Sequence, residues 1–168
     1  MLCAMDEAIV QETVDYIAIR RLQASYADIV TRRAWSELST IFLPDAPVIV
    51  DRRTGPPLEL VGPAAVGEFI GTQIERFDFF EFVILNTVID VAHEGDVDTA
   101  AARMYIWELR HDAADGRWTN SYGLYQDRYR RIDDRWWFER RFYQSLARTA
   151  RDYDVFSFPQ TFEFELPT

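Results

Sequence analysis

Few side chains in this sequence are able to do acid–base, nucleophilic or metal chemistry, and their spacing excludes several reaction classes. His93 and His111 are far apart and the one cysteine, Cys3, lies near the start, so no zinc-binding set of known spacing is present. Neither a glycine-rich phosphate loop nor the local pattern of a nucleophilic serine occurs. His111 is the candidate base for neutral pH in the second half of the chain, because His93 lies in a predicted turn. The alternative is that His111 faces water at the end of a strand.

The charge balance argues against two classes of partner. Of 168 residues, 28 are Asp or Glu and 18 are Lys or Arg, which gives a formal net charge of −10. Nucleic-acid binding needs a basic face and an anionic membrane surface repels an acidic protein, so we expect neither partner. The basic runs at 128–131 and 140–141 lie in alternating segments, which indicates solvated strand faces.

The composition indicates an ordinary globular chain. Apolar residues make up 48% of it, which excludes disorder, and its length fits one domain with a real core. A single cysteine forms no intramolecular disulfide, and the first residues lack a basic stretch followed by an apolar one. We therefore expect a cytoplasmic protein.

The elements that position the reactive groups begin with helices. Apolar residues recur every three or four positions from Val10 to Ile29, which predicts a helix of about five turns with one apolar side. The same spacing from Trp35 to Phe42 predicts a short second helix. Pro44 ends it, because the residue before a proline is pushed out of helical geometry.

A third helix follows a short strand. Residues 48–50 are β-branched and predict that strand, and a turn is expected at 54–57. Gly62 and Pro63 then open the helix, since a proline at the first helical position loses no hydrogen bond. Its expected buried side consists of Val66, Phe69, Ile70, Ile74 and Phe77.

The second half of the chain reads as strands. Four segments rich in β-branched and aromatic residues are separated by short turns, which predicts an antiparallel meander. They span residues 82–91, 99–111, 118–132 and 136–146. Three helices ahead of a meander favour an α+β fold in which the helices cover one face of a curved sheet.

No linker, internal repeat or low-complexity tract divides the sequence, so we expect a single domain over residues 1–168. The segment 151–168 carries phenylalanines at every second or fourth position, and we expect it to dock on the body or on a neighbouring subunit. These are Phe156, Phe158, Phe162 and Phe164.

Several local patterns occur in the order typical of one family. They are Tyr26-Ala-Asp-Ile-Val-Thr-Arg-Arg-Ala-Trp35, Phe42-Leu-Pro-Asp-Ala46, Gly62-Pro63, Asn86 with Ile89-Asp-Val91, and Tyr129-Arg-Arg-Ile-Asp-Asp-Arg-Trp-Trp-Phe138. Together they cover roughly residues 10–147, and the chain resembles the SnoaL-like branch of the nuclear transport factor 2-like superfamily. The resemblance implies a cone-shaped half-barrel, in which three N-terminal helices pack on a curved, mostly antiparallel sheet around a deep pocket.

The resemblance also shows a departure from the family pattern. Many of its lyases pair an aspartate, five residues after the tyrosine matched by Tyr26, with a histidine four residues before the position of Asn86. Those positions hold Thr31 and Phe82. Neither acts as a base, because a threonine hydroxyl is far too weak an acid and a phenyl ring has no proton to exchange. We expect both to contact the substrate instead.

Other residues are candidates for the base. Asp28 lies one helical turn before Thr31, and in a pocket with aromatic walls the pKa of its carboxyl would rise into the useful range. The alternative is a solvated Asp28 beside Arg32. His111 lies close to where scytalone dehydratase-like members place a second histidine.

Three further residues match positions with a role in the family. Arg141 matches a pocket arginine that steadies a developing negative charge. Tyr26 and Tyr125 match wall positions from which a phenol polarises a carbonyl oxygen. The alternatives are an exposed strand arginine and ordinary core tyrosines.

The resemblance therefore implies a protein with a pocket for a hydrophobic small molecule. We expect a cofactor-independent lyase, cyclase or isomerase acting on a polyketide-, terpenoid- or steroid-like compound, with no metal. The rival class is a non-catalytic binding or assembly module that lost the dyad. Aromatic residues expected on the outer sheet face, namely Trp118, Tyr122, Trp137 and Tyr143, predict a homo-oligomer, most simply a two-fold dimer.

Overall fold

The computed structural model describes residues 4–94, 97–149 and 153–163. Its elements are α1 (Ala4–Arg32), the 3₁₀ helix η1 (Trp35–Thr40), β1 (Pro47–Asp51), β2 (Leu58–Val61), α2 (Gly62–Ile74), β3 (Phe77–Glu94), β4 (Val97–Asp112), β5 (Trp118–Ile132), β6 (Arg135–Thr149) and β7 (Tyr153–Val155). The three predicted helices and the four long strands are present. The strands β2 and β7 were not predicted, because each is only three or four residues long and is defined by its pairing.

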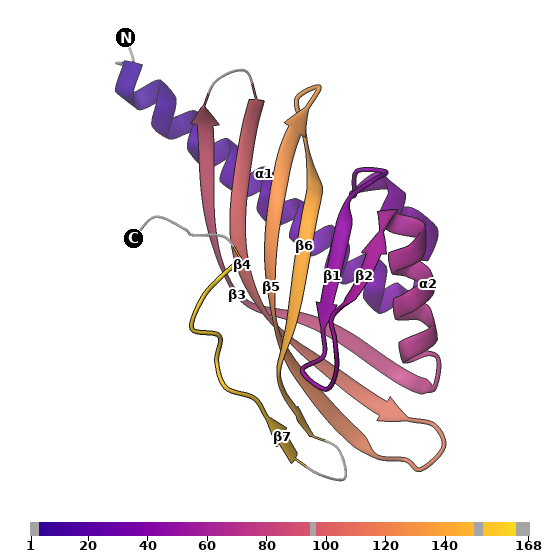
Figure 1. Ribbon diagram of the computed structural model, residues 1–168. Helices are drawn as coiled ribbons and strands as arrows, with labels where there is room; N and C mark the ends of the chain where they lie inside the picture. The colour runs from indigo at the N-terminus through magenta and orange to yellow at the C-terminus, as the bar shows by residue number, and fades with distance from the viewer. Residues whose placement is uncertain (1–3, 95–96, 150–152, 164–168) are drawn as a thin grey trace.

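The strands form one curved sheet that does not close. Its order is β2-β1-β6-β5-β4-β3, and β7 adds to β6. Pairing is antiparallel except between β1 and β6, which run parallel. Helix α1 crosses one face of the long strands, and α2 lies at the end of the sheet formed by β1 and β2 (Figure 1). The α+β class with helices on a curved, mostly antiparallel sheet is confirmed.

The second helix is shorter and tighter than predicted. It is a 3₁₀ helix of six residues, after which Phe42 forms a bridge to Phe138 of β6. The main-chain N–H of Leu43 donates to the carbonyl of Phe138 at 3.0 Å, and Phe138 N–H donates to Ile41 at 2.9 Å. This pairing with the sheet draws the chain out of helical geometry before Pro44 is reached.

Helix α1 buries only its second half against the sheet. From Ile19 onward its large apolar residues are buried, whereas Val10, Val14 and Ile17 are 54%, 52% and 44% exposed. The first turns of α1 reach past the edge strand β3 (Figure 1). The apolar stripe predicted from Val10 to Ile29 therefore finds a partner surface only where the sheet lies beneath it.

The core gathers around one tyrosine of α1. The Tyr26 ring lies 5.4 Å from Phe82 and 6.0 Å from each of Phe42, Tyr125 and Phe138, mostly edge to face. Such ring pairs contribute about 0.5–1.5 kcal/mol each beyond the area they bury. They fix α1 against β3, β5 and β6 on the concave face.

The C-terminal segment crosses the opposite face of the sheet (Figure 1). Phe158 stacks on Tyr105 at 6.3 Å, and the Arg103 guanidinium lies 4.4 Å over the Phe162 ring. The Glu163 N–H donates to Gln126 Oε1 at 2.5 Å. These contacts place residues 156–163 on the body of the protein, while Phe164 lies outside the described residues.

The four aromatic residues expected on the outer face do not share one surface. Trp118 is 56% exposed, and Tyr122 is partly buried and stacks on Trp107 at 6.4 Å. Trp137 is partly buried under the Arg135 guanidinium, 4.2 Å from its ring. Tyr143 lines the cavity described below, so its expected outward direction is wrong. No helix within the described residues combines the length and apolar character needed to cross a membrane.

Candidate functional site

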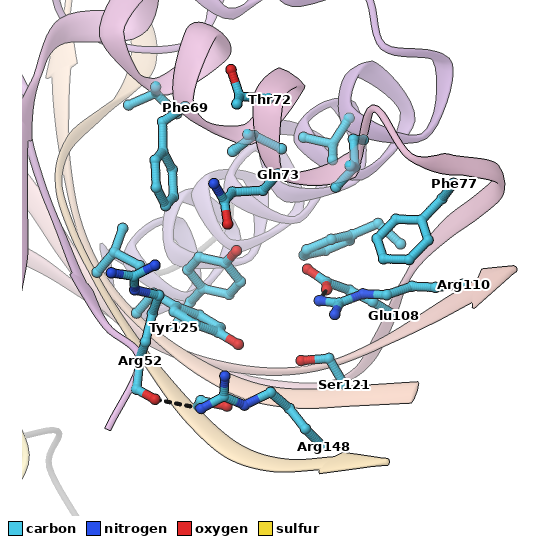
Figure 2. A pocket seen from close by; sticks show the side chains of 18 of the residues that line it. Arg52, Phe69, Thr72, Gln73, Phe77, Glu108, Arg110, Ser121, Tyr125 and Arg148 are labelled. Carbon is cyan, nitrogen blue, oxygen red and sulfur yellow. Dashed lines mark hydrogen bonds and ion pairs between the residues drawn. The ribbon is translucent and has the colours of Figure 1, made fainter. Parts of the chain in front are cut away.

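A cavity of about 560 Å³ lies between α2 and the concave face of the sheet (Figure 2). Side chains from α1, α2 and β1 to β6 line it, because the curvature of the long strands turns their inner faces toward the helix. Its apolar wall includes Val48, Val50, Val66, Phe69, Ile70 and Phe82. A mostly apolar cavity with a few converging polar groups is typical of small-molecule sites.

Four of the seven predicted site residues line this cavity: Tyr26, Phe82, Tyr125 and Arg141. Thr31 lies just behind the wall. Its Oγ1 accepts a hydrogen bond from the main-chain N–H of Phe82 at 3.1 Å. The two residues at the positions of the family's dyad are thus joined by a structural hydrogen bond.

The two predicted bases lie outside the cavity, which corrects the expectation that they point into it. Asp28 is two residues after Tyr26, about 200° around the helix, so its side chain is 61% exposed. Its carboxylate accepts a hydrogen bond from Arg32 Nε at 2.8 Å. His111 lies at the other face of β4 from its neighbour Arg110, and its Nδ1 is 2.5 Å from Asp78 Oδ1.

Glu108 is the carboxylate that lines the cavity among the described residues. Its side chain is 12% exposed and pairs with Arg110 on the same strand. Figure 2 shows both on the sheet with the Phe77 ring beside them, 5.5 Å from the Arg110 guanidinium. Strand phase was the sequence signal for this residue, because Met104, Ile106 and Glu108 share one face and the first two are buried.

The Arg141 guanidinium is the buried positive charge at the cavity wall. Its Nε donates to Asp127 Oδ1 at 2.7 Å and its Nη2 donates to Asp127 Oδ2 at 2.9 Å, with side chains only 1% and 0% exposed. It lies 4.0 Å from the Tyr26 ring and 4.2 Å from the Tyr125 ring. Burial alone would lower the pKa of Arg141, but the Asp127 carboxylate raises it above its ordinary value, so the guanidinium stays charged. Its Nη1 is buried and has no hydrogen-bond partner among the described residues.

A buried polar chain connects this pair to helix α1. Tyr129 Oη donates to Asp127 Oδ2 at 3.0 Å, and Gln23 Nε2 donates to Tyr129 Oη at 3.0 Å. Gln23 also donates to Thr87 Oγ1 of β3 at 3.2 Å. Both carboxylate oxygens of Asp127 are therefore held, and the direction of Arg141 is fixed from α1, β3 and β5.

Three tyrosines surround the polar end of the cavity. Burial raises the pKa of the Tyr26, Tyr125 and Tyr143 phenols above the ordinary value, so all three stay protonated and can donate a hydrogen bond. Gly123 makes room for one of them, since a Cβ there would lie 2.3 Å from Tyr143 Cε2. No group of three His, Cys, Asp or Glu side chains within the described ranges could hold a metal ion.

Comparison with known proteins gives a family and a fold. The model of the SnoaL-like domain family matches residues 11–142. No curated protein matches the sequence. A scytalone dehydratase-like protein from Novosphingobium aromaticivorans has 20% identity and a TM-score of 0.68, over 85% of this chain and 91% of that one.

Two more solved structures share the fold. An NTF2-like protein with a cystatin-like fold, also from Novosphingobium aromaticivorans, has 20% identity and a TM-score of 0.69, over 87% of this chain and 92% of that one. A hexachlorocyclohexane dehydrochlorinase from Novosphingobium barchaimii has 15% identity and a TM-score of 0.67, over 94% of this chain and 99% of that one. At such identities the likeness shows the fold alone.

Proposed function

Because the chain belongs to the SnoaL-like domain family, we propose that its cavity moves a proton at a carbon next to a carbonyl group of an apolar small molecule. The reaction class is a cofactor-independent lyase, cyclase or isomerase, and a polyketide-, terpenoid- or steroid-like compound fits the apolar wall. The observation that carries the proposal is Glu108, a carboxylate inside an aromatic cavity that holds protonated phenols and a charged guanidinium. Solved structures that share the fold of this chain include proteins described as a dehydratase and a dehydrochlorinase. Both names denote elimination reactions, which require loss of a proton from carbon.

In this mechanism Glu108 is the general base. It takes the proton, and the electron pair of the broken C–H bond moves into an enolate whose oxygen gains negative charge. Tyr125 Oη and the unpartnered Nη1 of Arg141 are the donors for that oxygen. The enolate then expels a leaving group from the neighbouring carbon or takes a proton back at another position. Donors fixed before the reaction stabilise the charge at no cost of reorganisation.

The rival function is a binding or assembly module. It is favoured by Thr31 and Phe82, which stand at the dyad positions and are tied to each other by a hydrogen bond. Either function is compatible with a homo-oligomer, which we retain as a proposal on the exposed Trp118.

Deuterium exchange tests the enzyme without knowledge of the substrate. The protein is incubated in D₂O with a panel of aromatic cyclic ketones such as 1-tetralone and 2-tetralone, and deuterium uptake next to the carbonyl is followed by mass spectrometry. We expect catalysed exchange, lowered about 10²–10⁴-fold in Glu108→Gln because the base is lost. Asp28→Asn is the matched control and keeps the wild-type rate, since Asp28 lies outside the cavity. Wild-type protein that binds these ketones without exchanging their protons would support the binding module.

A further inference from the structure

We infer that the ligand of this cavity carries a carboxylate, bound by Arg52 and Arg148 away from the reacting carbon. The inference rests on the proposed function, because it takes the same cavity as the binding site. It begins with charge: five arginines line the cavity within the described residues, against the single carboxylate of Glu108. These are Arg52, Arg76, Arg110, Arg141 and Arg148. In a chain with a formal net charge of −10, this concentration of positive charge faces inward rather than outward.

Three of these arginines are neutralised by the protein. Arg141 pairs with Asp127, Arg110 pairs with Glu108, and Arg76 Nε lies 3.4 Å from Asp112 Oδ2. These three ion pairs leave Arg76, Arg110 and Arg141 with little net positive charge to attract an anionic ligand.

Among the side chains that the structure describes, the other two cavity arginines, Arg52 and Arg148, form no ion pair with a carboxylate. Arg148 Nη2 donates to the main-chain carbonyl of Arg52, and no described residue forms a hydrogen bond with its buried Nε. The Arg148 guanidinium lies 5.1 Å from the Phe156 ring, which restricts its direction further. Both arginines therefore line the cavity, and the described carboxylates leave their positive charges unpaired.

The parallel pairing of β1 with β6 brings these two residues together. Asp51, the last residue of β1, stands opposite Gln144 of β6, so the chain leaves β1 beside the end of β6. Figure 2 shows Arg52 and Arg148 on one side of the cavity and Glu108 with Arg110 on the other. A molecule that spans the cavity can therefore place an anionic group on the first pair and its reacting carbon near Glu108.

Charge favours a carboxylate over a phosphate. Guanidinium groups can hold either anion with paired N–H donors, so the electrostatic surroundings decide between them. The last turn of α2, with Thr72 and Gln73, lines the same cavity, and the partial negative charge of a helix C-terminus disfavours a dianion. The ligand class is an apolar, ring-containing monocarboxylate.

Calorimetry with probes of one shape and different charge tests this inference. The probes are 2-naphthoate, 2-naphthamide and 2-naphthyl phosphate. We expect naphthoate to bind wild-type protein about tenfold more tightly than naphthamide, and also more tightly than the phosphate. Raising the salt from 50 to 500 mM should remove most of the difference, because a partly exposed ion pair is screened.

Variants then assign the preference to the site. Arg52→Gln is expected to weaken naphthoate five- to tenfold and to leave naphthamide unchanged, while Arg52→Lys recovers part of the loss. Arg21→Gln is the matched control: it removes the same charge from the exposed surface of α1, away from the cavity, and should change neither affinity. The Arg52 side chain is exposed and bonds to no other side chain in the described ranges, so its replacement should leave the thermal midpoint unchanged.

Equal affinity of the wild type for naphthoate and naphthamide would overturn the inference. So would a phosphate that binds more tightly, or an Arg21→Gln variant that loses as much naphthoate affinity as Arg52→Gln. The experiment measures binding alone, so Glu108→Gln is expected to keep the preference for naphthoate. Catalysed exchange in ketones without tighter binding of naphthoate would reject the carboxylate ligand and keep the proposed reaction. Tighter binding of naphthoate without catalysed exchange would keep the carboxylate ligand and reject the proposed reaction.

Discussion

The buried pair of Arg141 and Asp127 offers the sharpest test of the energetics of this site. Asp127→Ala would leave a guanidinium that is 1% exposed without its counter-charge. Removing one partner of a buried pair costs about 3–5 kcal/mol, because the remaining charge stays out of water uncompensated. The lost acceptor of Tyr129 Oη adds about 1 kcal/mol. For a chain of 168 residues, each kcal/mol lowers the midpoint of thermal unfolding by about 2–4 °C, so we expect a fall of about 10 °C or more.

A double variant separates the pair interaction from simple loss of packing. Asp127→Leu combined with Arg141→Met replaces both charges by apolar groups, and the rings that flank Arg141 can pack on the methionine. Such replacements are often neutral or stabilising, so we expect the double variant to unfold within about 2 kcal/mol of the wild type. Tyr129 Oη loses its acceptor in the double variant too, and this loss accounts for the part of the range in which the double variant is less stable than the wild type.

Urea unfolding followed by far-UV circular dichroism gives the free energies of unfolding. Asp127→Leu, Arg141→Met and the double variant are measured at one pH, and the coupling energy is the change in the double variant minus the sum of the changes in these two single variants. We expect it to be several kcal/mol. A loss below 1 kcal/mol in Asp127→Ala, or a double variant as unstable as the sum of the single variants, would refute the reasoning.

Two further outcomes follow from the tyrosines of the core and cavity. Gly123→Ala should lower the free energy of unfolding by about 1–3 kcal/mol and weaken ligand binding, because its Cβ would meet Tyr143 Cε2 at 2.3 Å and push the ring. Gly55→Ala is the control, since a Cβ there has nothing within 4 Å. Equal stability of the two variants in urea would contradict the contact. Alkaline pH should also destabilise the protein, because the unfolded phenols release their protons near pH 10 while four buried ones keep theirs to higher pH. Their raised pKa values therefore stabilise the fold fully below about pH 10 and less as the pH rises, with a slope of about 1.4 kcal/mol per pH unit for each phenol. Urea midpoints that stay level from pH 9 to pH 11 would contradict this. The four are Tyr26, Tyr125, Tyr129 and Tyr143.

Interactions local in the chain determined the elements that sequence could predict. Gly62 and Pro63 begin α2 where expected, because a proline fixes its own backbone angle whatever the surrounding fold. The alternation along residues 99–111 and 118–132 appears as β4 and β5. That Thr31 and Phe82 carry no group that titrates near neutral pH is likewise a fact of sequence, because it holds in any fold.

Tertiary structure decided which side chains meet in the cavity. Asp28 lies one helical turn before Thr31, which favoured a place in the pocket, yet its side chain points about 200° away from Tyr26, and only the position of the sheet shows which side is inside. The inward direction of Glu108 depends on which face of β4 meets the helices, and the regular ladder between β4 and β5 places Glu108 opposite Ser121, which also lines the cavity. A one-residue slip would turn every side chain of a strand to the other face.

The pairing of Arg52 with Arg148 lies furthest from anything the sequence determined. The two residues are separated by 96 positions and become neighbours because β1 inserts parallel to β6. Local propensity made each segment extended, but the free energy that selects this pairing comes from burying β1 and α2 against the rest of the sheet. The sequence by itself determined the two α-helices, the four long strands and the lack of a base at Thr31 and Phe82. The chemistry of the cavity follows from long-range pairing, which no short stretch of residues encodes.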